Sequence, residues 1–109
     1  MITNSQSGTN VHEVADGIYR INIPVTLPGG VGQFNFNQYL VVDDAPLLFH
    51  TGHRRMFPVV REGMARVIAP ESLRWISFGH VEADECGAMN ETATPSTPHA
   101  ITGPPFARL

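Results

Sequence analysis

Apolar and polar residues alternate along the first half of the chain, and this period of two constrains the fold more than any other feature. Residues 18–23 alternate between apolar and polar side chains up to Pro24, and they follow the turn Asp16-Gly17, into which residues 11–14 run. Alternation puts the apolar side chains on one face of an extended strand. The pattern predicts a hairpin of half-buried strands, followed by a mobile glycine-rich loop at residues 24–32 and a strand at residues 35–42.

The middle of the chain changes from alternating to continuously apolar strands. Residues 39–42 and 47–50 flank a turn at residues 43–46, and residues 73–78 form another apolar run. Such strands are typical of a sheet covered on both faces. Residues 56–67 lie between them and carry apolar side chains at helical spacing, namely Phe57, Val60, Met64 and Val67. The strand-helix-strand order predicts an α/β fold.

Length and charge exclude several classes of protein. The chain has 109 residues and a formal charge of -3, with its basic residues scattered, so we expect one domain and no nucleic-acid partner. No apolar run approaches the roughly 20 residues that span a bilayer, so we expect no membrane partner. Cys86 is the only cysteine, and the first residues lack the pattern of a secretion signal. We therefore expect a cytoplasmic protein.

Three potential metal ligands, His80, Glu82 and Asp84, follow the last apolar strand at a spacing of two. In an extended segment their side chains would point to one side. One imidazole and two carboxylates suit iron, manganese or zinc. Alternatively, the acids belong to a solvated loop in which Asp84 caps a helix beginning at Glu85. The pattern alone leaves both interpretations open.

The order of four motifs resembles a known superfamily. These motifs are residues 16–19, residues 36–41, the pair Thr51-Gly52 and residues 75–85. They resemble the metallo-β-lactamase superfamily, and within it the flavodiiron and oxygen-binding diiron proteins. The resemblance covers about residues 11–91. It implies the amino-terminal part of an αββα sandwich, a truncated α/β domain with a mostly antiparallel or mixed sheet and covering helices.

The resemblance also implies a ligand set. His80 and Glu82 would bind one iron and Asp84 the second, so the implied cofactor is two iron ions, with zinc or manganese as alternatives. Hydrolytic members carry histidine where Glu82 stands, and many members carry histidine at the position of Glu85. Family members take further ligands from later in a longer chain. The implied partners are a small diatomic ligand such as oxygen and a redox partner.

The two ends of the chain differ in composition from residues 11–91. Residues 1–10 are polar, which predicts a flexible leader. Residues 92–109 are proline-rich and lack strand or helix periodicity, which predicts an irregular tail, and we interpret this tail as an out-of-frame or truncated ending. Half a sandwich would leave open strand edges, which predicts a homo-oligomer. Two alternatives to a diiron protein stay open: a non-catalytic remnant that needs a partner to fold, and a metal-dependent hydrolase.

Other residues with reactive or aromatic side chains receive structural interpretations. We expect His12, His50 and His53 to lie at the surface or behind the metal ligands. We expect Cys86 to be structural, because no base is paired with it. Trp75 and Phe78 are predicted to be core residues of their strand.

Overall fold

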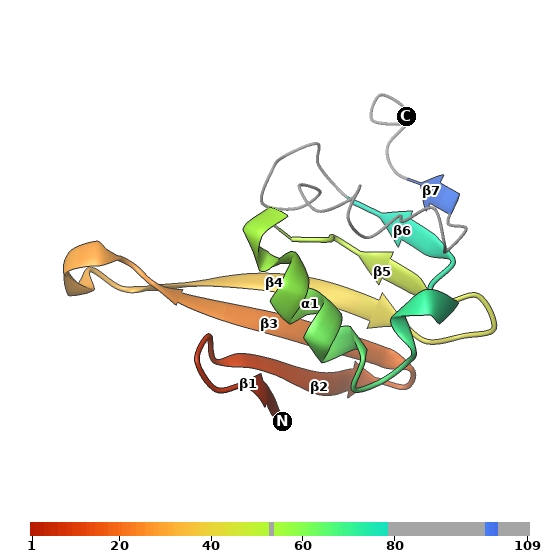
Figure 1. Cartoon of the computed structure of the whole chain (residues 1–109), viewed down its shortest axis with the longest axis horizontal. Coiled ribbons are helices and arrows are strands. Elements are labelled where there is room, and N and C mark those ends of the chain that lie inside the picture. Colours follow the sequence, from red (N-terminus) through yellow and green to blue (C-terminus); the bar gives the residue numbers. More distant parts are fainter. Residues whose placement is uncertain (53, 79–99, 103–109) are drawn as a thin grey trace.

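The computed structural model describes residues 1–52, 54–78 and 100–102, and within them one sheet contains seven strands in chain order (Figure 1). The strands are β1 (Ile2–Asn4), β2 (Thr9–Ala15), β3 (Ile18–Thr26), β4 (Gln33–Val41), β5 (Leu47–Phe49), β6 (Trp75–Ser77) and β7 (Ala100–Thr102). The helical segments are α1 (Phe57–Met64) and the short 3-10 turns η1 (Pro28–Gly30), η2 (Arg54–Met56) and η3 (Pro70–Ser72).

The sheet is mixed. Strands β1 to β5 pair antiparallel with their neighbours, whereas β5, β6 and β7 pair parallel. The change of direction occurs where α1 carries the chain from the end of β5 back to the start of β6, as a crossover between parallel strands requires. The predicted α/β class with a mixed sheet is confirmed. No helix in the described part of the chain is both long and apolar enough to cross a membrane.

The alternating residues of the central strands form the core, as predicted. Ile21 of β3 stands opposite Val11 of β2 and Gln38 of β4, and all three side chains are buried on one face of the sheet. The same face continues through Leu40 and Leu48 to β5 and β6. Burial of the apolar side chains among them is the main contribution of the alternating strands to the stability of the fold.

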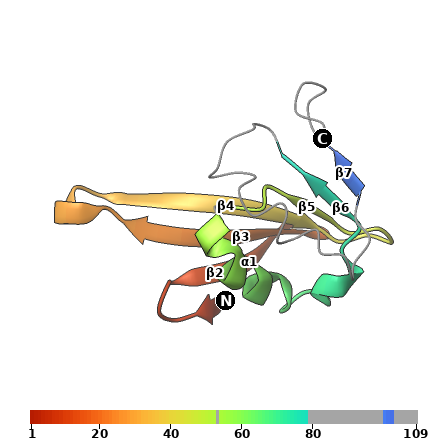
Figure 2. The ribbon, with the colours of Figure 1, turned by 45° about the horizontal axis from the view of Figure 1, so that its top comes forward.

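Helix α1 covers this apolar face across β1, β2 and β3 (Figure 2). Val60 and Met64 contribute buried side chains, and Gly63 lies against the sheet. A Cβ atom on Gly63 would lie 3.1 Å from methyl groups of both Ile21 and Val11, so the absence of a side chain allows the close approach. The helix ends at Met64 rather than at residue 67, because the N–H groups of Arg66 and Val67 donate to carbonyls three residues earlier in place of four.

The opposite face of β2, β3 and β4 carries a ladder of asparagine side chains. Asn22 accepts a hydrogen bond from Asn10 at 3.1 Å and donates to Asn37 at 2.8 Å and to Asn35 at 3.3 Å. Asn10 lies on β2, Asn22 on β3, and Asn35 and Asn37 on β4, so the ladder crosses three strands. Cross-strand amide pairs of this kind stabilise the sheet on a face that no apolar layer covers among the described residues.

Residues 1–10, expected as a flexible leader, contain regular secondary structure. Residues 2–4 form β1, and β2 begins at Thr9. Thr3 and Thr9 are buried, and the Thr3 hydroxyl donates to the Thr9 carbonyl at 3.3 Å. These polar side chains can be buried because their hydroxyl groups form local hydrogen bonds. The polar composition of residues 1–10 does not reveal such bonds.

The loop expected at residues 24–32 is shorter in the structure. β3 continues to Thr26 and pairs with Gln33, which leaves a turn at residues 27–32 closed by a bond from the Leu27 N–H to the Gly32 carbonyl of 2.9 Å. The resulting β3–β4 arm extends past the rest of the sheet (Figure 1).

Two further expectations need correction. Residues 100–102, expected within an irregular tail, form β7 beside β6. Trp75 was expected in the core, but it is 40% exposed, because it stands on the face of β6 opposite the buried Ile76. Phe78 is buried, as predicted.

The close approach of α1 to the sheet predicts that Gly63→Ala lowers the free energy of unfolding by about 1–3 kcal/mol, although alanine favours helices. The added methyl group must displace Ile21 or Val11. Chemical denaturation followed by circular dichroism measures the change. Arg61→Ala is the matched control on the exposed side of α1, where the 3.0 Å pair with Glu71 contributes about 0.5 kcal/mol. A Gly63→Ala variant as stable as the parent would contradict the described packing.

Candidate functional site

The carboxyl ends of β5 and β6 lie side by side, because these two strands are parallel. Leu48 pairs with Ile76, and Phe49 pairs with Ser77. Beyond β5 the N–H of His50 donates to the carbonyl of Ser77 at 2.8 Å, which extends the ladder by one bond. The carboxyl edge of parallel strands is where ligand sites form in open α/β sheets.

The predicted ligands His80, Glu82 and Asp84 lie outside the described residues, and so do His53 and Cys86. The described chain reaches Phe78, two residues before the first predicted ligand. Among the described residues, no group of three His, Cys, Asp or Glu side chains is arranged to hold a metal ion. The ligand assignment therefore stays a prediction.

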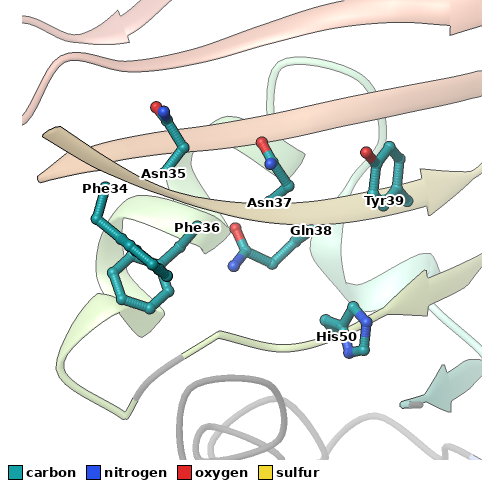
Figure 3. A pocket seen from close by; sticks show the side chains of 7 residues that line it. All are labelled: Phe34, Asn35, Phe36, Asn37, Gln38, Tyr39 and His50. Atoms are coloured by element: carbon teal, nitrogen blue, oxygen red, sulfur yellow. The ribbon is translucent and has the colours of Figure 1, made fainter.

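A pocket of about 320 Å³ lies beside this edge of the sheet. It is lined by residues 34–39 of β4 and by His50 (Figure 3). Figure 3 shows Phe34, Phe36 and Gln38 on one side of β4, facing the same space as His50. The rings of Phe34 and Phe36 have their centroids 4.9 Å apart and make one end of the pocket apolar.

Gln38 supplies a polar group to this pocket. Its residue is 1% exposed, and its Oε1 atom has no hydrogen-bond donor among the described residues. Most buried side-chain oxygens accept at least one hydrogen bond. The Gln38 side chain lines the pocket, although its Oε1 atom is itself buried.

The backbone at Gly52 packs closely against the Gln38 side chain. Gly52 has φ of 81°, and a Cβ atom there would lie 3.1 Å from the Gln38 Nε2 and 3.5 Å from a Val60 methyl group. His50 also has a positive φ, of 63°, which is uncommon outside glycine. Strained backbone of this kind is concentrated at functional sites.

His50 was expected at the surface or behind the ligands, and the structure makes it a half-buried pocket residue. Its ring packs edge-on against Phe49 with a centroid distance of 4.2 Å. Sequence reasoning did not assign Gln38 to any site. The available signal was its position in the alternation, because Gln38 falls on the inward face between Phe36 and Leu40.

Two other groups lie on strands away from this pocket. His12 is exposed on β2, where its ring nitrogens lie 3.3 and 3.4 Å from the amino group of Met1. The Glu13 carboxylate raises the pKa of the Tyr19 phenol, with burial of the phenol as a smaller cause. Neither of these residues lines the pocket.

No protein-family model and no curated protein matches the sequence. Solved structures do match. The rubredoxin oxygen:oxidoreductase of Desulfovibrio gigas aligns with a TM-score of 0.74 and 24% identity, over 84% of this chain and 25% of that protein. A flavo di-iron protein of Thermotoga maritima aligns with a TM-score of 0.68 and 18% identity, over 87% of this chain and 26% of that protein.

A metallo-β-lactamase of Pseudomonas aeruginosa, solved in a mono-zinc form, aligns with a TM-score of 0.67 and 14% identity, over 91% of this chain and 43% of the enzyme. This chain thus spans about a quarter to less than a half of the length of the three structures. The predicted metallo-β-lactamase-like fold is confirmed for the part of it that this chain spans. The chain has part of the fold that flavodiiron proteins and metallo-β-lactamases share.

Proposed function

We propose that this chain carries the first half of a dinuclear iron site, with His80, Glu82 and Asp84 as its ligands, and that it is related to the flavodiiron oxidoreductases. One observation carries the proposal. The bond from the His50 N–H to the Ser77 carbonyl joins the ends of β5 and β6 beside the pocket. In the sequence, the candidate ligands therefore follow the carboxyl end of β6, which is the edge of the sheet where a ligand site is expected.

The chemistry of the three side chains supports iron. A neutral imidazole and two carboxylates form a set of nitrogen and oxygen donors that suits iron, and zinc or manganese would be the alternatives. The hydrolytic alternative has support from the metallo-β-lactamase neighbour. We favour the diiron assignment over it because glutamates occupy positions 82 and 85, where the hydrolytic pattern has histidines.

When bound, the iron pair would supply the binding and reduction of a small diatomic molecule such as oxygen, with electrons from a redox partner. The described residues would provide the surroundings of that molecule. Phe34 and Phe36 give the pocket an apolar end, and the Gln38 side chain lines the same pocket. A pocket that combines two aromatic rings with amide and imidazole side chains suits a small ligand that makes both apolar and hydrogen-bonding contacts.

A second candidate is a non-catalytic remnant that needs a partner to fold. It is favoured by the partial coverage, because this chain spans only 25% of the rubredoxin oxygen:oxidoreductase and 26% of the flavo di-iron protein. Both candidates are compatible with a cytoplasmic location, since a single cysteine forms no internal disulfide.

The diiron proposal predicts that the purified chain, loaded with ferrous iron without oxygen and then desalted, retains about one to two irons. His80→Ala should lose most of this iron, because it removes the imidazole ligand. Elemental analysis measures the metal, and parallel loading with zinc and manganese tests the preference. His12→Ala is the matched control, an exposed histidine on β2 outside the pocket.

Two results would decide against the assignment. Iron retention well below one per chain in the parent, unchanged in His80→Ala, would favour the remnant. Retention of zinc in place of iron, lost in the same variant, would favour the hydrolytic alternative.

The unmet acceptor of Gln38 predicts that Gln38→Met raises the free energy of unfolding by about 1 kcal/mol in the metal-free protein, since an apolar side chain of similar size removes a buried polar group without a partner. Denaturant titration measures the change. Gln6→Met, in the exposed turn between β1 and β2, is the control and should change stability by less than about 0.5 kcal/mol. A clear loss of stability in Gln38→Met would mean that the carboxamide is already satisfied in the free protein.

A further inference from the structure

In the described part of the chain, the outer edge of β4 is unpaired along more than half of the strand. β4 pairs with β3 from Gln33 to Val41, but it pairs with β5 only from Tyr39 onward. Among the described residues, no strand pairs with residues 33–38 on that side. An unpaired strand edge exposes backbone donors and acceptors that can bind another strand.

The other edge of the same arm is protected. Pairing of β2 with β3 ends at Asn22, and the next positions along that edge include Pro24. Proline has no N–H to offer to a further strand. The turn at Gly8 also packs there, because a Cβ atom on Gly8 would lie 3.0 Å from the Pro24 ring. As far as the described residues go, the arm therefore has one protected edge and one open edge.

The sequence along the open edge is self-complementary when two copies pair antiparallel. Residues 33–37 read Gln-Phe-Asn-Phe-Asn, with no charge, proline or glycine. Phe34 is 51% exposed, although it is a large apolar side chain. Short uncharged segments that alternate aromatic and amide side chains are typical of strands that associate with copies of themselves.

We propose that two copies of this chain pair antiparallel along this edge of β4, about a twofold axis at Asn35. A twofold axis perpendicular to the sheet keeps like faces on the same side, so position i pairs with position 70 minus i of the second copy. Phe34 then faces Phe36 of the other copy, and Gln33 faces Asn37. Every cross-strand pair joins either two aromatic rings or two amides, which are favourable pairs.

The asparagine ladder supports this register. Asn22 already donates to Asn35 and Asn37 on the amide face of β4. Pairing at Asn35 continues the row of amides into the second copy, while the rings of Phe34 and Phe36 meet their counterparts on the other face. The interface contains no charged side chain from residues 33–37, so no like-charge repulsion opposes association. This association does not depend on metal binding.

The first test is sedimentation velocity of the full metal-free chain over a range of concentrations. The parent and the His80→Ala variant should both form dimers. Phe34→Lys should weaken dimerisation roughly tenfold or more, because symmetry brings two lysines into one interface. Thr26→Lys adds the same charge to the exposed end of β3 and should leave the dimer unchanged. A monomer at every concentration, or equal weakening by both substitutions, would overturn the proposal.

The second test determines the register by disulfide crosslinking. In a Cys86→Ser background, Asn35→Cys should form an intermolecular disulfide under mild oxidation, because the twofold axis places the two residues opposite each other. Asn37→Cys is the matched control on the same face and faces Gln33 instead. Selective crosslinking at position 35 supports the register, and equal or preferential crosslinking at position 37 would overturn it.

Discussion

The parallel pairing of β5 with β6 is the constraint on which the candidate site depends. Each strand is only three residues long, and the pair is held by the fully buried side chains of Leu48 and Ile76 and by the extra bond from His50 to Ser77. Parallel strands need a crossover, which α1 provides while covering the apolar face. Gly63 lets that helix lie close to Ile21 and Val11 of the sheet.

The two faces of the sheet serve different purposes. The face under α1 is apolar and holds the fold together, but it also includes Gln38, a buried carboxamide whose oxygen has no donor among the described residues. The other face carries the asparagine ladder. Because side chains alternate between faces, one strand, β4, supplies both the lining of the pocket and the amides of the ladder.

Much of this fold could be predicted from the sequence, because period and composition reveal which face of a strand is buried. The β2–β3 hairpin and the strand-helix-strand unit follow from the alternation and from the apolar runs. β1 could not be predicted, since its burial depends on local hydrogen bonds of Thr3 and on the long-range contact with Gly63. Gln38 was not assigned to a site, because a polar residue at an inward position indicates a pocket only when the residues around it are known. The ligands His80, Glu82 and Asp84 remain a sequence prediction, with a described strand leading towards them.

The most direct test of the central claim, that the metal binds at the carboxyl edge of β5 and β6, is paramagnetic broadening in amide NMR spectra of the chain titrated with Mn²⁺. The account predicts that signals of His50, Ser77 and Phe78 broaden first. Signals of β1, four strand spacings or about 19 Å from β5, should stay sharp. Broadening of β1 at the same Mn²⁺ concentration, or sharp signals at His50 and Ser77 when the metal is bound, would contradict it.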